Sequence, residues 1–251
     1  MRTMGKQDNI YESGNLSGLP FAFNKEVTEV FEDMIDRSVP GYKTSLSLIS
    51  LFAKQYYQEG TNCYDLGCSL GASSLSILKS VPSARVIGID NSKAMIEECL
   101  SRFETLMTNQ SLSFLCEDIM KSELRNASFV TVNYLVQFLD LAQRDNLFKK
   151  IHKALLPGGI LLMSEKVHYE NSYESNRIFK THHKFKSVNG YSQLEISSKR
   201  DSLEGVLMTE SEDDHFLRGR RVGFERSAKV LSNLNFRTLI FFKCVCLYPK
   251  K

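Results

Sequence analysis

The stretch YDLGCSLG at residues 64–71 decides the fold prediction. It follows a short apolar approach and contains two glycines, Gly67 and Gly71, four positions apart. Glycine lets the chain turn sharply out of a strand and lets a ligand approach the backbone without an intervening side chain. The middle glycine of the dinucleotide pattern is replaced by Ser69, and a phosphate loop of the form GxxxxGK[ST] is absent. The stretch therefore predicts either a nucleotide-type loop or a plain strand-to-helix turn.

Short apolar runs alternate with amphipathic patterns after this loop. Strands are predicted near residues 62–66, 85–90, 112–117, 129–133 and 159–164, and helices precede them near residues 24–39 and 44–57. The apolar segment at residues 236–248 predicts one or two more strands, which can form an antiparallel hairpin at the sheet edge. The order predicts an α/β fold with a mostly parallel sheet covered by helices.

The domain organisation follows from length and local polarity. The chain has 251 residues, of which 42% are hydrophobic and 24% charged, and this is enough for one large core. Residues 1–22 are polar and predict a flexible N-terminal arm, so that residues 23–251 form a single domain. Residues 167–211 are too long for a simple loop and predict a helical cap insertion over the ligand edge of the sheet.

The charge and cysteine content exclude several classes of protein. The net charge of +3 predicts no strong general attraction to nucleic acid or to an anionic membrane, and the basic cluster Arg218, Arg220 and Arg221 is interpreted as a solvated helix face. No apolar run reaches the roughly 18 residues of a membrane-spanning helix, and the N-terminus lacks the apolar core of a signal peptide, so we expect a cytoplasmic protein. The six cysteines lack paired CxxC spacing and are predicted to be reduced, packed thiols.

Two acidic positions strengthen the nucleotide interpretation. Asp90 ends the strand after the loop, about twenty residues on, where an acid can accept both hydroxyls of a ribose. Asp118 and Ile119 follow the third strand, where a carboxylate and a backbone amide suit the edge of an adenine. The alternatives are a helix cap within the sequence DNS at residues 90–92 and a solvated strand end at Asp118. All these positions fall at the carboxyl ends of successive parallel strands, where open sheets bind ligands.

The loop DLGCSLG, with acids in this order, resembles the first motif of the class I S-adenosylmethionine-dependent methyltransferases. The flanking sequences are similar to the carboxy-S-adenosyl-L-methionine synthase family over roughly residues 23–243. This resemblance implies a Rossmann-like fold with a mostly parallel seven-stranded sheet, helices on both faces and a helical cap. The sequences that carry it are DMIDRSVPGY (33–42), IDNSKAMIE (89–97), NYLVQFL (133–139), LLPGGILLMSEK (155–166) and HHKFKSVNGYSQLEISSKR (182–200).

The resemblance implies an unusual reaction. Prephenate loses carbon dioxide and becomes phenylpyruvate, and the carbon dioxide is captured by the methyl group of S-adenosyl-L-methionine after its deprotonation to a ylide, which yields carboxy-S-adenosyl-L-methionine. The hydroxide that leaves prephenate can take the proton. The product is the carboxymethyl donor for modification of a wobble uridine in tRNA. The resemblance further implies a homodimer, and we expect no metal, no membrane association and no direct binding of tRNA.

Site residues are carried over by motif. The resemblance places Tyr42, Gly67, Cys68 and Ser69 against the cofactor, Asp90 and Asn91 at the ribose, Asp118, Ile119 and Asn133 at the adenine side and pocket wall, and Arg200 at the new carboxylate. A planar guanidinium offers paired donors to a carboxylate and has nothing to bind on a methyl group. Without the flanking sequence, Lys199 and Arg200 would be interpreted as a solvated surface pair.

Other interpretations stay open. The adjacent His182 and His183 lack partners at metal-ligand spacing, so prephenate contacts or packing are preferred to a metal site. A conventional methyltransferase would share the fold and the loop but would not need Arg200. A non-catalytic module that binds S-adenosylmethionine would also share them, because a fold does not establish an activity.

Overall fold

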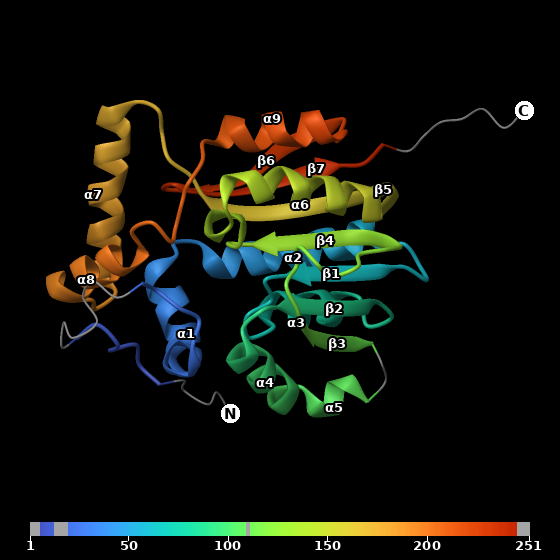
Figure 1. Cartoon of the computed structure of the whole chain (residues 1–251), viewed down its shortest axis with the longest axis horizontal. Coiled ribbons are helices and arrows are strands. Elements are labelled where there is room, and N and C mark those ends of the chain that lie inside the picture. The colour runs from blue at the N-terminus through green and yellow to red at the C-terminus, as the bar shows by residue number, and fades with distance from the viewer. Residues whose placement is uncertain (1–5, 13–19, 109–110, 245–251) are drawn as a thin grey trace, which may run out of the picture.

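The computed structural model describes residues 6–12, 20–108 and 111–244, and it contains a seven-stranded sheet with the strand order β3-β2-β1-β4-β5-β7-β6. The first five strands in this order run parallel, and β7 pairs antiparallel with both β5 and β6. This arrangement confirms the predicted mostly parallel seven-stranded α/β fold (Figure 1). The strands are β1 (Asn62–Leu66), β2 (Arg85–Asp90), β3 (Leu112–Cys116), β4 (Ala127–Asn133), β5 (Leu155–Lys166), β6 (Arg226–Asn233) and β7 (Phe236–Phe242).

Helices cover both faces of the sheet and its ligand edge. The helices are α1 (Lys25–Ser38), α2 (Tyr42–Tyr56), α3 (Ala72–Ser80), α4 (Lys93–Arg102), α5 (Glu104–Met107), the 3-10 helix η1 (Val136–Phe138), α6 (Leu141–Ala154), α7 (Ser172–Val188), α8 (Gln193–Leu203) and α9 (Glu212–Val222). In Figure 1, α7, α8 and α1 stand beyond the arrowheads of β1 and β4, so they cover the carboxyl ends of these strands. Two helices thus lie within residues 167–211, the segment predicted to be a helical cap.

Strand alternation produces two apolar cores, one on each face of the sheet. Cys63 points to the core formed with α2, α3 and α4, and its neighbour Tyr64 points to the core formed with α6 and α9. Consecutive strand residues face opposite sides because the side-chain period of a strand is two. Every residue of β1 is buried, as expected of a central parallel strand covered on both faces.

The N-terminal segment differs from the prediction, and the C-terminal antiparallel hairpin is confirmed at the sheet edge with a different partner strand. Within the predicted flexible arm, Asp8 and Tyr11 are buried, because Asp8 bonds to α1 and Tyr11 lies 2.9 Å from the hydroxyl of Ser202 in α8. The hairpin partner of β7 is β6, an edge strand whose polar, half-exposed sequence hid it from the periodicity argument. Of the predicted final strand, residues 245–248 lie outside the described residues.

Two further predictions need correction. Arg218 is buried rather than solvated, and it donates to Asp145 at 2.7 Å and to Glu210 at 2.6 Å. Tertiary partners therefore override the expected exposure of a basic cluster. Cys116 is exposed, whereas Cys63, Cys68 and Cys99 are buried as predicted, and Cys246 lies outside the described residues. No helix in the described ranges is both long and apolar enough to span a membrane.

Candidate functional site

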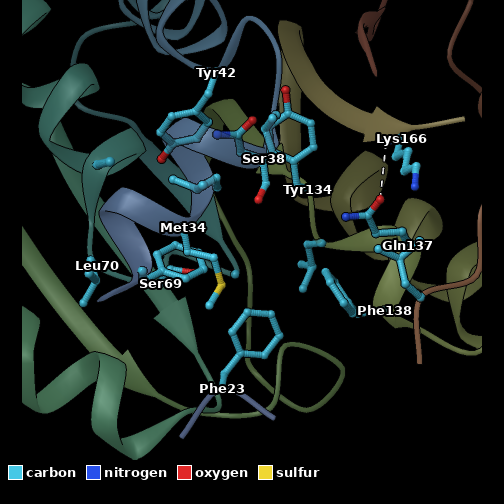
Figure 2. A pocket seen from close by; sticks show the side chains of 18 of the residues that line it. Phe23, Met34, Ser38, Tyr42, Ser69, Leu70, Tyr134, Gln137, Phe138 and Lys166 are labelled. Carbon is cyan, nitrogen blue, oxygen red and sulfur yellow. Dashed lines mark hydrogen bonds between the residues drawn. The ribbon is translucent and has the colours of Figure 1, made fainter. Parts of the chain in front are cut away.

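A cavity of about 650 Å³ lies where the carboxyl ends of β1, β2 and β4 meet the helical cap. This volume is in the range of about 300–1,000 Å³ that small-molecule sites occupy. Figure 2 shows Ser69 and Leu70 on one side of the cavity, Lys166, Gln137 and Phe138 on the other, and Phe23, Met34 and Tyr42 between them. Strand ends and the loops after them supply one set of polar groups, and α1, α7 and α8 supply others and close the space over them.

The loop after β1 forms one wall because its backbone adopts conformations that side chains disfavour. Gly67 has a φ of +70°, and a Cβ atom there would lie 2.9 Å from Cδ1 of Leu135. Ser69 also has a positive φ, +46°, and its amide donates a 2.9 Å hydrogen bond to the carboxylate of Asp90. This bond offsets the cost of a left-handed conformation at a non-glycine residue. The loop is therefore held against the end of β2.

Asp90 presents both carboxylate oxygens to the site. One oxygen accepts the Ser69 amide, and the other accepts the amide of Ser92 at 2.8 Å. Burial raises the pKa of Asp90, and these backbone bonds oppose the shift. Each oxygen keeps a free lone pair, so the carboxylate can still accept the two hydroxyls of a ribose. The cap of α4 is made by the hydroxyl of Ser92, which accepts the Met95 amide, so Asp90 is not needed for that role.

Two buried oxygens near the loop have no partner among the described residues. They are Oδ1 of Asp65 and Oδ1 of Asn133, and Asn133 lines the cavity. The other oxygen of Asp65 accepts from the amide and the hydroxyl of Ser74, and burial raises the pKa of this carboxyl to about 7. Buried acceptors are normally satisfied, so the Asn133 oxygen, which belongs to a residue of the cavity lining, calls for a donor from a ligand. An adenosyl ligand with an amino-acid tail carries such donors, and the residues present fit S-adenosyl-L-methionine.

Aromatic rings line the middle of the cavity. The rings of Tyr42 and Tyr134 have centroids 6.3 Å apart, and burial raises the pKa of both hydroxyls, so both stay protonated. Aromatic faces attract cations, including a sulfonium. Tyr134 precedes a turn that Glu165 holds in place, because the Glu165 carboxylate accepts the amides of residues 135–137. Burial raises the pKa of Glu165 to about 8.

Seven of the ten predicted site residues line this cavity: Tyr42, Gly67, Cys68, Ser69, Asp90, Asn91 and Asn133. The thiol of Cys68 shares a hydrogen bond with the side chain of Cys99. This hydrogen bond and burial raise the pKa of Cys68, so its side chain is a packed thiol. The other three residues lie outside the lining.

Asp118, Ile119 and Arg200 are placed differently. Asp118 is exposed in the turn after β3, where its carboxylate accepts the Met120 amide at 2.9 Å, and Ile119 is buried beside it. The backbone of Glu117 donates to Asp90 at 2.9 Å, so this turn neighbours the site. The Arg200 side chain is 56% exposed on α8 and pairs with Asp201 at 2.9 Å. Contacts of Asp118 and Ile119 with adenine, and of Arg200 with a carboxylate, stay predictions.

Three lysines that were not predicted from the sequence also line the cavity: Lys166, Lys186 and Lys199. We call this group the lysine wall. Lys166 ends β5, Lys186 lies on α7 and Lys199 on α8. One signal was available: His182 and Lys186 are four residues apart on a helix, so they share a face, and His182 also lines the cavity.

His182 is a neutral packed side chain in this structure. Its Nε2 lies 2.8 Å from the carbonyl oxygen of Ser38, to which it donates, and burial lowers its pKa to about 3. The ring also contacts Phe236 with centroids 5.1 Å apart. Among the residues that the structure describes, no group of three or more His, Cys, Asp or Glu side chains could hold a metal ion.

Comparison with known sequences identifies close relatives. A family model described as a methyltransferase domain matches residues 64–159. A Klebsiella pneumoniae protein named carboxy-S-adenosyl-L-methionine synthase is 39% identical over 242 residues, which are 96% of this chain and 98% of that protein. Proteins of the same name from Shigella boydii and Hahella chejuensis are 40% and 38% identical, and the alignments cover 96% and 94% of this chain and 98% of each relative.

Solved structures with the same fold are more distant in sequence. An O-methyltransferase family protein from Burkholderia thailandensis superposes with a TM-score of 0.62 at 13% identity, covering 95% of this chain and 69% of that one. Human N-acetylserotonin methyltransferase, solved in complex with SAM, gives a TM-score of 0.59 at 14% identity, covering 87% and 55%. These likenesses show the methyltransferase fold.

Proposed function

Since the chain belongs to the carboxy-S-adenosyl-L-methionine synthase family of transferases, we propose that it converts S-adenosyl-L-methionine and prephenate into carboxy-S-adenosyl-L-methionine, phenylpyruvate and water. Prephenate provides the carbon dioxide and a hydroxide, the methyl group gives up one proton, and the proton and hydroxide form the water. The product would serve as the carboxymethyl donor for modification of a wobble uridine in tRNA.

The single observation that supports this proposal best is the division of the cavity into two chemically distinct ends. The loop and Asp90 form an end suited to an adenosyl group, and the lysine wall forms an end suited to an anion. The tyrosines and the side chains of Phe23 and Phe138 form the apolar space between them. Such a cavity can orient a methyl group and an anionic donor of carbon dioxide against each other, which is the main contribution of positioning to catalysis.

A conventional methyltransferase is the alternative function. It needs the adenosyl end of the cavity and a nucleophilic acceptor, and buried cations at the other end would bring it no advantage. A non-catalytic binding module would need only the adenosyl end. Conversion of prephenate therefore separates the proposed function from both alternatives.

The test is to incubate the purified protein with S-adenosyl-L-methionine and prephenate, denature it, and weigh the released nucleosides by mass spectrometry. We expect a species heavier than S-adenosyl-L-methionine by one carbon dioxide, together with phenylpyruvate. Transfer of the methyl group with release of S-adenosylhomocysteine, or binding without conversion, would rule the proposal out.

An Arg200→Ala variant in the same assay tests the predicted carboxylate contact. If Arg200 grips the new carboxylate, the variant loses retention of the carboxylated species and still binds S-adenosylhomocysteine. Equal loss of both ligands would indicate a structural role for Arg200 instead.

A further inference from the structure

The lysine wall carries more positive charge than its surroundings compensate. Lys199 lies 3.8 Å from the carboxylate of Asp8, and its ammonium donates to the hydroxyl of Ser38 at 3.3 Å. Neither Lys166 nor Lys186 has an ion pair or a side-chain hydrogen bond among the described residues. Three amino groups thus stand against one carboxylate, so two positive charges are left over when all three lysines are protonated.

The acids of the cavity wall do not compensate this charge. Glu32 pairs with Arg102, Asp36 pairs with Lys43 at 2.7 Å, and Asp90 accepts two backbone amides. Each of these carboxylates therefore already has an ion-pair or hydrogen-bond partner and does not pair with the lysine wall. The surplus charge remains at the cap end of the cavity.

Lys186 is the best defined member of the lysine wall because it is buried and without a partner. It is 9% exposed, and the lining of the cavity includes it. Burial and, to a lesser extent, the neighbouring Lys199 and Lys166 lower the pKa of Lys186 to about 7, whereas Asp8 opposes the shift. A buried ammonium without a counter-ion destabilises a fold, so its presence in a ligand cavity indicates a ligand anion.

We propose that Lys166 and Lys186 bind the two carboxylates of a dicarboxylate second substrate, and this inference rests on the proposed function only in taking that substrate to be prephenate. Prephenate carries two carboxylates, which match the two uncompensated charges. The cavity lining also contains Phe138, Leu203, Leu207 and Phe236, and these apolar side chains can pack against the six-membered ring, which carries both carboxylate-bearing groups on one of its carbons.

The two lysines come from different parts of the fold and meet only at this cavity. Lys166 ends β5 in the sheet, and Lys186 lies on α7 in the cap. A ligand that bridges them also draws the cap toward the sheet, which excludes water from the space where the carboxylate is transferred. Lys199 on α8 is already paired with Asp8, so its charge is compensated without a ligand.

The test uses Lys166→Met and Lys186→Met, because methionine keeps the length of the side chain and removes its charge. Prephenate binding is measured by calorimetry on the full chain loaded with S-adenosylhomocysteine, and the KM for prephenate is measured in the assay above. We expect the Kd and the KM to rise by about ten- to a hundred-fold in each variant, as for the loss of one charged hydrogen bond in a buried site. The affinity for S-adenosylhomocysteine should stay unchanged.

Lys184→Met is the matched control. Lys184 is exposed on α7, two residues from Lys186, and lies outside the cavity lining. This variant should bind prephenate as the unmodified chain does. Lys186→Arg, which restores the charge, should recover most of the prephenate affinity.

Thermal unfolding separates binding from a structural role. Removal of an unpaired buried charge should raise the melting temperature of Lys186→Met by about 4–10 °C, whereas a structural lysine would lower it on removal. An unchanged prephenate Kd in both methionine variants would overturn the proposal. An equal loss of S-adenosylhomocysteine affinity would also overturn it, because the lysines would then bind the amino-acid carboxylate. If the unmodified chain binds prephenate but does not convert it, the proposed function fails while the calorimetry still tests the lysine wall.

Discussion

Among single residues, Asp90 joins the backbone of the glycine loop to the start of α4. Its carboxylate accepts the amides of Ser69 and Ser92, which come from the two segments that flank the cavity floor. A charged acceptor strengthens both bonds and keeps lone pairs for ribose hydroxyls. The alternatives of a helix cap and a ribose ligand therefore do not compete, since Ser92 makes the cap and Asp90 is free to bind.

The lowered pKa of Lys186 leads to a prediction about stability and pH. The folded-state pKa of about 7 lies below the ordinary value of 10.5, so between these values the unfolded chain holds the proton and the folded chain does not. The destabilisation from Lys186 is therefore full below about pH 7 and is lost as the pH rises toward 10.5. The charged and titratable groups that interact with it are Lys166, Lys199, Asp8, His182 and His183.

The measurement is urea unfolding of the unmodified chain and of Lys186→Met at several pH values. We expect Lys186→Met to be more stable by about 2–4 kcal/mol at pH 6.5, and the difference to shrink to near zero by about pH 10. Lys184→Met should show no difference at any of these pH values. A constant difference across the range would mean that Lys186 does not change its protonation on unfolding.

At the scale of elements, the segment at residues 6–12 connects α1 to α8 through Asp8. The Asp8 amide donates to Asp33 at 2.7 Å, its carbonyl accepts from Arg37 at 3.1 Å, and its carboxylate accepts the hydroxyl of Tyr191 and faces Lys199. Asp8 is 2% exposed, so these bonds are shielded from water. Part of the predicted flexible arm thus forms part of the cap.

An Asp8→Ala substitution should therefore destabilise the chain by about 3–5 kcal/mol, because it leaves Lys199 buried without a counter-ion. Denaturant unfolding measures this change. The double variant Asp8→Ala with Lys199→Met should recover part of the loss, since both buried charges are then absent. If the single and the double variants were equally unstable, the contact between Asp8 and Lys199 would not contribute to the stability of the fold.

Polar networks also fix α9 to α6. Glu210 accepts from Arg144 and Arg218, each at 2.6 Å, and Arg144 also donates to the carbonyl of Met208 at 2.7 Å. Arg144 is fully buried. These bonds connect residues 208–210, which follow the cap helices, to α6 and α9, and so help to position the cap helices over the cavity.

At the scale of the whole molecule, we propose that the chain forms a homodimer through the cap helices. Large apolar side chains are exposed there: Tyr173 is 75% exposed, Val188 73% and Leu194 52%. These side chains are spread along α7 and the start of α8, and extended exposed apolar surface is typical of protein interfaces. In Figure 1, α7 stands apart from the strands of the sheet, and only His182 and Lys186 of this helix are buried.

Light scattering on the purified chain tests the homodimer. We expect a mass of twice the 28.6 kDa of one chain, and a shift toward one chain when Val188 and Leu194 are both replaced by glutamate. Leu51→Glu is the control, since Leu51 is a similarly exposed leucine on α2. A mass of 28.6 kDa for the unmodified chain would rule out the homodimer.

The absence of direct tRNA binding also stays a prediction.

From the amino-acid sequence alone we could predict the parallel strands β1 to β5, the glycine loop and the acid at the end of β2, but not the edge strand β6. These features are local: they depend on apolar periodicity, on the backbone freedom of Gly67 and on the distance along the chain from the loop to Asp90. Most of the adenosyl end of the cavity could therefore be predicted, because the carboxyl ends of parallel strands meet at one edge.

Only the tertiary structure decided which cations face the cavity. Lys199 and Arg200 are neighbours in sequence, yet α8 turns Lys199 inward and leaves Arg200 paired with Asp201 outside. Lys166 and Lys186 meet only because the cap folds back over the end of β5, and Asp8 reaches Lys199 from the other end of the chain. Burial and charge balance depend on such distant contacts. Sequence patterns do not reveal contacts between residues far apart in the chain, so the lysine wall could be found only in the structure.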